Sequence, residues 1–137
     1  MRNLLIKICI RLLRYLSRDR IGIIYHTERE MDRRRRNSSA FDVVRKEVTS
    51  YYGVPFTKMV EKCRRRKVLE PRQMFHFLAY KYSKMSTAEI GALTNLDHAT
   101  VLHSMKVTRN LIDTEPAKEE EYNILCKNIE NRLVTIK

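Results

Sequence analysis

The segment from Ser86 to Lys106 constrains the fold more than any other part of the chain. "STAEIGAL" begins at Ser86 and carries Glu89 three residues later, which is the capping-box pattern at the start of a helix. After the three residues "TNL", Asp97 stands where it can cap a second helix, "HATVLHSMK". Two helices joined by so short a turn, the first one short and containing a glycine, predict a helix-turn-helix.

The rest of the chain after residue 36 also has the pattern of helices. We expect one helix to start at Asn37, Ser38 or Ser39 and end at Gly53, a short one to follow Pro55, one to begin at Pro71, and a last one to follow Pro116. Apolar residues at helical spacing predict the positions that face the core: Phe41, Val44, Val48, Tyr51 or Tyr52, Met74, Phe77, Leu78, Tyr82, Ile90, Leu93, Val101, Leu102, Met105, Tyr122, Leu125, Ile129 and Leu133. The fold class is therefore all-α, a small domain of about five to six helices.

The positive charge is large and unevenly distributed. Lys and Arg total 28 against 16 Asp and Glu, which gives a net charge of +12. Residues 1–36 contain eleven cations and four acids, a difference of +7, and residues 37–137 contribute seventeen and twelve, or +5. Such an excess points to a polyanion, either nucleic acid or an anionic membrane surface. The basic junction "RRRRNSSA" at 33–40 predicts a boundary between an arm, 1–36, and a domain, 37–137.

The arm has the pattern of a cationic amphipathic helix. Four cations recur at steps of four, three and four residues, and apolar residues cover much of the remainder: Lys7, Arg11, Arg14 and Arg18 against Leu5, Ile8, Leu12 and Leu16. This pattern is typical of a helix that lies on an anionic membrane or docks on a protein, and it is too short and too charged to span a bilayer. The alternative is that Met31 is the true start and residues 1–30 are an upstream extension or a tail. Both interpretations stay open.

The second helix of the helix-turn-helix carries candidate base-reading residues. In this motif the second helix enters the major groove and its N-terminal residues contact base edges. Asp97 can accept from a cytosine amino group, His98 can bond to or pack on a base, Ala99 can contact a thymine methyl, and Thr100 can reach a base or a phosphate. Further along the helix, two residues are expected toward the DNA backbone: His103 and Lys106. The plainer alternative is that Asp97 is only an N-cap and His98 a solvated first-turn residue.

A run of cations precedes the helix expected at Pro71. It comprises Lys62, Arg64, Arg65, Arg66 and Lys67, and Arg72 and Gln73 follow at the expected helix start. A loop that ends in a helix N-terminus binds anions, because free N–H groups and the helix dipole point at the ligand. We therefore expect this loop to bind DNA phosphates, and an arginine on it to enter the minor groove.

Taken together, "RRRKVLEPRQM", "STAEIGAL" and "LDHATVLHSMK" give the chain a family resemblance. Over about residues 40–133 it resembles the C-terminal DNA-binding domain of the DnaA family, the bacterial replication initiators. The resemblance implies that Arg64 is the minor-groove arginine and that Thr100 lies near a phosphate. It also implies two further groups, the backbone-contacting residues Arg66, Arg72 and Gln73 and the base-reading residues Asp97, His98 and Ala99.

The chain departs from the family pattern at three places. Ala99 stands where the family usually has threonine, which keeps a methyl group and loses a hydroxyl. The turn "TNL" is one residue shorter than the family's Phe-Gly-Gly-Arg and offers no arginine before Asp97. Glu70 precedes Pro71 where a basic residue is common. We therefore expect the chain to bind double-stranded DNA at a site diverged from the standard DnaA box.

The expected function is sequence-specific binding of double-stranded DNA in replication initiation, in its regulation, or in transcription control. The alternative is a basic protein that docks on a membrane surface or a partner and keeps the fold without reading DNA. No G-x-x-x-x-G-K-[ST] phosphate loop occurs, so the ATPase module of the family is not expected. The sequence shows no nucleophile or metal-ligand spacing, and Cys9, Cys63 and Cys126 are scattered. We expect no catalytic site, cofactor or metal, and a cytoplasmic location.

Overall fold

The computed structural model describes residues 29–136 of the chain. The chain divides into two units, Met1–Arg35 and Arg36–Lys137, and each is described by itself. Within the first unit, residues 29–35 are helical, and Glu30 forms an ion pair with Arg34 at 3.3 Å. The amphipathic pattern predicted over residues 5–18 lies outside the described residues.

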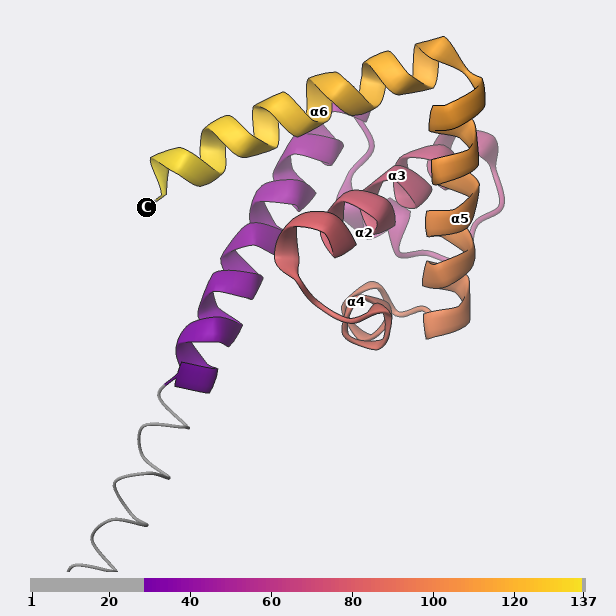
Figure 1. The fold of residues 1–137 in the computed structure, drawn as a ribbon. Helices are drawn as coiled ribbons and strands as arrows, with labels where there is room; N and C mark the ends of the chain where they lie inside the picture. The colour runs from indigo at the N-terminus through magenta and orange to yellow at the C-terminus, as the bar shows by residue number, and fades with distance from the viewer. Residues whose placement is uncertain (1–28, 137) are drawn as a thin grey trace, which may run out of the picture. The chain divides into compact units, whose positions relative to one another are not determined.

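The second unit is built from helices throughout its described residues. They are the helical residues 36–52, α2 (Phe56–Met59), α3 (Arg66–Ser83), α4 (Thr87–Thr94), α5 (His98–Thr114) and α6 (Pro116–Thr135), as Figure 1 shows. No strand occurs among residues 29–136, and α4 and α5 form the expected helix-turn-helix. The prediction of a small all-α domain is therefore confirmed.

The helix over residues 36–52 begins earlier than the sequence predicts. Asn37, Ser38 and Ser39 are helical, as are the residues before them, so the predicted cap at 37–39 is wrong. Placing asparagine or serine inside a helix costs less than about 1 kcal/mol relative to alanine, too little to force an end there. The other end agrees with the prediction, because Gly53 takes a φ of +64° just after the last helical residue.

Three phenylalanines from three helices form the centre of the core. The ring of Phe75 lies 5.3 Å from that of Phe41 and 5.4 Å from that of Phe56, both in edge-to-face geometry. Of the core positions predicted from helical spacing, nine are buried: Phe41, Val44, Val48, Met74, Leu78, Ile90, Val101, Leu125 and Ile129. Five more pack against this core while partly exposed: Tyr52, Tyr82, Met105, Tyr122 and Leu133. Phe77 is also partly buried, with its ring 5.7 Å from that of Tyr122.

Two of the predicted core leucines are exposed, so those predictions are wrong. Leu93 on α4 is 51% exposed and Leu102 on α5 is 57% exposed. On α4 the buried positions are Ile90, Gly91 and Thr94. At about 100° of rotation per residue, Leu93 therefore lies well away from the centre of that buried face. On α5 the buried positions Val101, Ser104 and Thr108 likewise turn Leu102 outward.

The last helix, α6, completes the core from outside the helix-turn-helix. Pro116 occupies its first turn, and Leu125 and Ile129 are fully buried. The buried carboxylate of Glu47 on the 36–52 helix pairs with Arg132 on α6. The hydroxyl of Tyr82 on α3 donates to Glu130 at 2.7 Å. Thus α6 holds the 36–52 helix and α3 together, as its course in Figure 1 shows.

Candidate nucleic-acid interface

The first helix of the helix-turn-helix, α4, starts with the predicted capping box. The Ser86 hydroxyl accepts from the Glu89 backbone N–H at 3.2 Å, and the Glu89 carboxylate accepts from the Ser86 N–H at 2.7 Å. This reciprocal pair satisfies two backbone donors that a helix start leaves free. The helix therefore begins where the sequence predicts.

The turn between α4 and α5 is closely packed around Gly91. The Leu96 backbone N–H donates to the Gly91 carbonyl at 2.9 Å, and Asn95 takes a left-handed φ of 54°. A Cβ placed on Gly91 would lie 2.6 Å from the Leu96 carbonyl oxygen. Because that neighbour is backbone, no side chain can move to make room. The glycine is thus required for α4 to approach the start of α5.

The first turn of α5 combines a cap with exposed side chains. The Asp97 carboxylate accepts from the Thr100 backbone N–H at 2.9 Å, which makes Asp97 the N-cap. Hydrogen bonding with Thr100 also lowers the pKa of Asp97. His98 and Ala99 are exposed, and Thr100 is partly exposed. The residues predicted to read bases therefore lie on the surface, with Asp97 also serving as the cap that the plainer alternative expects.

Further along α5, the exposed and buried positions separate into two faces. Val101, Ser104 and Thr108 are buried, and Val101 anchors the helix in the core. His103 and Lys106 are exposed, at the positions expected to lie toward a DNA backbone. The exposed Leu102 lies beside His103 on the same outer side. An apolar side chain on such a face can contact a thymine methyl group. The sequence pattern did not indicate this possibility for Leu102, because it predicted Leu102 to be a core residue.

The basic run is exposed but meets α3 differently from the prediction. Arg64, Arg65, Arg66 and Lys67 are all exposed. The helix begins at Arg66, with Arg65 at the N-cap position, so the prediction of a helix start at Pro71 is wrong. The backbone N–H groups of Val68 and Leu69 already bond to the Arg65 carbonyl. Pro71 therefore lies inside α3, where it removes one backbone donor without ending the helix.

Arg72 and Gln73 point inward, unlike typical phosphate-contacting residues. Arg72 is only 6% exposed, and its guanidinium donates to the carbonyls of Met59, Glu61 and Cys63, the last at 3.2 Å. Gln73 is 9% exposed. Arg72 therefore fixes, from inside, the path of the basic loop, which comprises residues 60–65 between α2 and α3. No local sequence pattern predicts this, because the carbonyl groups involved lie nine to thirteen residues earlier in the chain.

Glu70, the acidic departure from the family pattern, lies between two cations. Its carboxylate accepts from Arg66 at 2.6 Å and from Lys118 on α6 at 3.3 Å. The hydrogen bond from Arg66 is the main cause that lowers the pKa of Glu70. Glu70 is thus a member of an ion-pair network and does not stand as an isolated negative charge beside the basic run.

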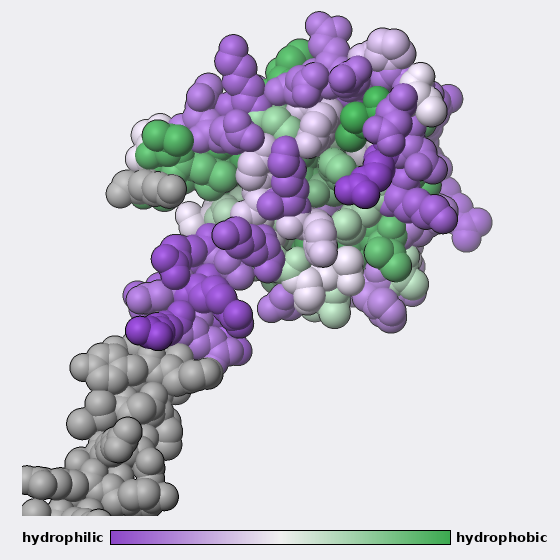
Figure 2. All heavy atoms as spheres, in the orientation of Figure 1, coloured by the Kyte–Doolittle hydropathy of each residue, from purple (hydrophilic) through white to green (hydrophobic). Residues whose placement is uncertain are grey.

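The basic loop and the start of α5 line one groove. Its volume is about 470 Å³, and its lining residues are Lys62, Cys63, Arg64, Arg72, Asn95, Leu96, Asp97 and Thr100. The fold thereby brings together Arg64, expected in the minor groove, and Asp97 and Thr100, expected at the bases. On the face of the domain in Figure 2, hydrophilic residues predominate and apolar ones form small separate patches.

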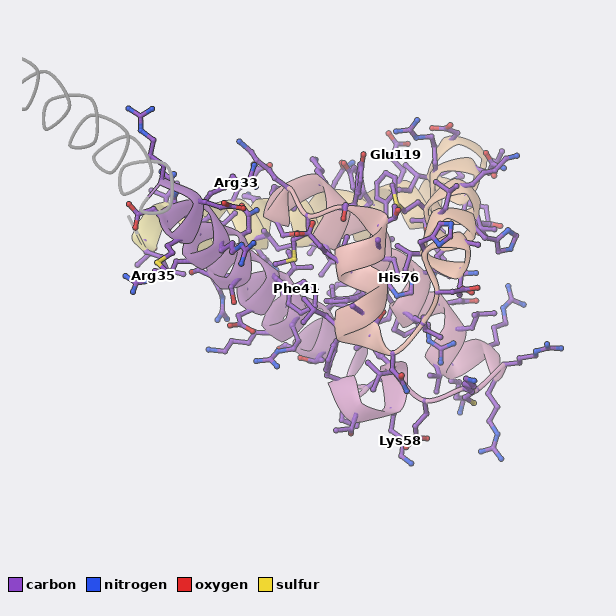
Figure 3. All side chains as sticks on the ribbon, turned by 90° about the horizontal axis from the view of Figure 1, so that it is seen from below. Arg33, Arg35, Phe41, Lys58, His76 and Glu119 are labelled. Carbon is purple, nitrogen blue, oxygen red and sulfur yellow. The ribbon has the colours of Figure 1, made fainter. Side chains whose placement is uncertain are left out.

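One buried histidine was not singled out by sequence reasoning. His76 on α3 is fully buried, and neither of its ring nitrogens has a hydrogen-bond partner. Burial, assisted by the nearby Arg72 charge, lowers its pKa to about 4. In Figure 3 His76 lies among the helices, whereas Lys58 projects from α2 into solvent. The buried position of His76 and its lowered pKa indicate a neutral core residue.

Two further site types are not found among residues 29–136. No group of three potential metal-binding side chains occurs in that range. Over the same range, no helix combines the length and the apolar character needed to cross a bilayer.

Comparison with known proteins gives one consistent family. Residues 41–107 match the model of the bacterial DnaA protein helix-turn-helix. The chromosomal replication initiator protein DnaA of Flavobacterium psychrophilum is 38% identical over 77 residues, which are 56% of this chain and 16% of that protein. The DnaA proteins of Rickettsia canadensis and Rickettsia rickettsii are each 33% identical over 89 residues, 64% of this chain and 19% of theirs.

The matched region contains the features described above. It begins at Phe41 in the core and includes the basic loop, the capping box and the first turns of α5. The chain spans less than a fifth of the length of these curated relatives. Residues 41–107 therefore form a helix-turn-helix domain of the bacterial DnaA C-terminal type.

Proposed function

We propose that the chain binds double-stranded DNA sequence-specifically, in replication initiation, in its regulation, or in transcription control. The observation that carries this proposal is the shared groove, in which Arg64 of the basic loop and Asp97 and Thr100 of α5 line the same space. The relatives are named as chromosomal replication initiators, which supports a role connected with replication.

The proposed mechanism divides the interface into two parts. The N-terminal turn of α5 enters the major groove, where His98 and Ala99 contact base edges and Asp97 accepts from a base with the lone pairs its cap leaves free. Arg64 reaches the adjacent minor groove, while Arg65, Lys67, His103 and Lys106 lie toward the backbone. Phosphate contacts set register and salt dependence, and base contacts carry the sequence information.

The inward-facing residues have indirect roles in this proposal. Arg72 keeps the basic loop in place through the carbonyls of Met59, Glu61 and Cys63. Gln73 is also buried, and the Arg66 guanidinium forms an ion pair with Glu70. We therefore assign direct phosphate contact to Arg65 and Lys67 ahead of Arg72 and Gln73. The altered turn and Ala99 lead us to propose a site diverged from the standard DnaA box.

Selection of random duplexes by the full chain tests this proposal. We expect one recovered motif, and binding that weakens with salt with a slope corresponding to about four phosphate contacts. His98→Ala and Ala99→Thr should each change the recovered motif, because a good base contact contributes about 1–3 kcal/mol of discrimination. Lys106→Ala is the matched control and should lower affinity for all sequences alike. If all four proteins return the same motif with the same strength, α5 does not read bases.

A further inference from the structure

The first turn of α3, which carries Arg66 and Lys67, is weakly joined to the rest of its helix. Pro71 is the sixth residue of α3 and has no backbone N–H, so the Lys67 carbonyl loses the donor that a regular helix provides. The turn over residues 66–70 therefore needs other contacts to fix its direction. Two anchors supply them, one on each side of Pro71.

The first anchor is the inward-facing Arg72, which grips the loop before α3. The second is an ion-pair chain that runs from the basic run to α6. Arg66 donates to one oxygen of Glu70 at 2.6 Å, and Lys118 donates to the other at 3.3 Å. Lys118 also donates to Glu121 at 2.9 Å, and Glu121 in turn accepts from the hydroxyl of Tyr52 at 3.1 Å.

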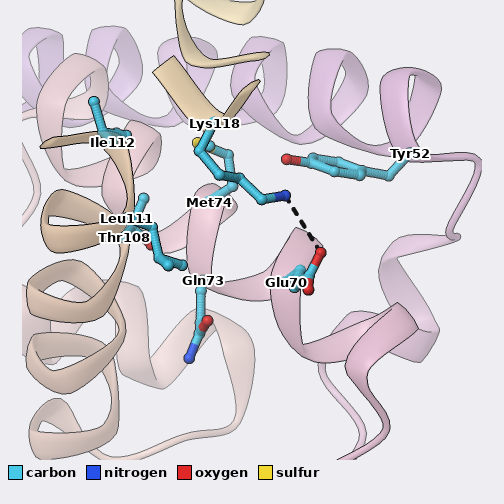
Figure 4. Close-up of a pocket in the computed structure, with 8 residues that line it drawn as sticks. All are labelled: Tyr52, Glu70, Gln73, Met74, Thr108, Leu111, Ile112 and Lys118. Atoms are coloured by element: carbon cyan, nitrogen blue, oxygen red, sulfur yellow. Dashed lines mark hydrogen bonds and ion pairs between the residues drawn. The ribbon is translucent and has the colours of Figure 1, made fainter. Parts of the chain in front are cut away.

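The exposed fractions of the linked side chains show which residue of the ion-pair network anchors the others. The side chain of Lys118 is 16% exposed, that of Glu70 30%, and that of Arg66 89%. Burial opposes the charge of Lys118, yet hydrogen bonds to Glu121 and Glu70 raise its pKa overall. Figure 4 shows Lys118 reaching from α6 toward Glu70, with Tyr52 nearby. The cavity beside them, about 10 Å³, is too small for more than about one water molecule, so these groups face one another and not a ligand.

We propose that Lys118 and Glu70 are positioning residues of the DNA interface, which fix the first turn of α3 and the basic loop relative to α6. Neither residue touches DNA in this scheme, and Lys118 lies 48 positions from Glu70 in sequence. The tether also gives Glu70 a use that a repelling charge next to phosphates would not have. This inference rests on the proposed function, because it assigns residues that place the DNA-binding cations.

Two opposite expectations for Glu70→Gln make the inference testable. If Glu70 acted only through its charge, removing it would raise the net charge by one and tighten binding to any duplex. If Glu70 is the link to Lys118, the variant should bind more weakly in spite of the added charge. We expect a loss of about five- to tenfold in affinity of the full chain for its selected duplex. Tighter binding would overturn the proposal.

Lys118→Met tests the other end of the tether, with Lys127→Met as the matched control. Lys127 is an exposed lysine on the same helix, so both variants lose one positive charge. Lys118→Met should weaken binding about five- to tenfold and lessen the salt slope by about one phosphate contact, whereas Lys127→Met should change neither appreciably. Lys118→Arg, which can still bridge two carboxylates, should restore both. Equal effects of Lys118→Met and Lys127→Met would overturn the proposal.

A double-mutant cycle with Arg64→Ala separates positioning from general stability. If Lys118 acts through the basic loop, the loss caused by Arg64→Ala should be smaller in the Lys118→Met background than in the parent. Additive losses would mean that Lys118 acts elsewhere. If Lys118→Met does not fold, as melting would show, the same cycle with Glu70→Gln decides. Absence of salt-dependent duplex binding by the parent chain would instead contradict the proposed function.

Discussion

The carbonyl oxygen of Leu96 lies only 2.6 Å from where any side chain at position 91 would place its Cβ. Two opposing effects meet at Gly91. Alanine is favoured over glycine inside a helix by about 1 kcal/mol, but here its methyl group would press on backbone of the turn. Because backbone cannot rotate away as a side chain can, the clash should dominate.

Gly91→Ala is therefore expected to destabilise the chain by about 1–3 kcal/mol and to displace the start of α5. Urea unfolding of the parent and the variant measures the stability change. The same variant should lose selectivity among duplexes, because His98 and Ala99 shift with the helix. A variant as stable as the parent would show that the turn can open without cost.

Arg72→Met should destabilise the basic loop from within. Methionine keeps an apolar stem but leaves the carbonyls of Met59, Glu61 and Cys63 without their charged donor, and a hydrogen bond to a charged group contributes about 1.5–3 kcal/mol. We expect the free energy of unfolding, measured with urea, to fall by about 2–3 kcal/mol. Arg65→Met, at an exposed neighbouring position, should stay within about 0.5 kcal/mol. Hydrogen exchange in residues 59–65 should rise only in the Arg72 variant.

His76 predicts an acid-sensitive stability. Its pKa falls from 6.5 to about 4 on folding, so the unfolded chain binds the proton more tightly. The free energy of unfolding is therefore highest above about pH 6.5. Up to about 3 kcal/mol of it is lost as the pH falls toward about 4, because His76 then takes up a proton more readily in the unfolded chain. His76→Leu should remove this dependence and, by eliminating two buried nitrogens without partners, raise stability at pH 5. Melting curves between pH 4 and pH 7 test both expectations, and parallel pH profiles of parent and variant would contradict them.

The domain should fold without its N-terminal residues. The buried hydrophobic side chains of the described part run from Ala40 to Ile129. We therefore propose that a protein beginning at Met31 melts at the same temperature as the full chain. A markedly lower melting temperature of the shorter protein would show that residues 1–30 contribute to the packing of the domain.

The features that the sequence predicted well are local ones. Ser86 with Glu89, Asp97 and Gly53 each act through backbone groups within a few residues, so their spacing in the chain carries the full signal. The heptad-like recurrence of apolar residues on α6 similarly predicted Leu125 and Ile129. Such patterns depend on helix geometry alone, which is the same in every protein.

The errors arose where tertiary packing decided between local options. Proline is common in the first turn of a helix, yet here one turn of α3 precedes Pro71. Within that turn Arg66 pairs with Glu70, and Lys118 supports it from α6. Leu93 and Leu102 have core-like side chains, but the faces of α4 and α5 were set by their neighbours. The inward turn of Arg72 likewise depends on a loop that folds back over it. No pattern within a short window of sequence contains this information.

Leu125 and Ile129 fill the core from beyond residue 107, where the match to the DnaA helix-turn-helix ends. A protein engineer who transplanted only residues 41–107 would carry across the proposed DNA-binding surface but would leave uncovered the core side chains that pack against α6. Those apolar side chains would be exposed to solvent, and an exposed apolar surface of this kind favours aggregation. The segment that completes the core of this domain is therefore longer than the segment that matches the DnaA helix-turn-helix, because it includes α6.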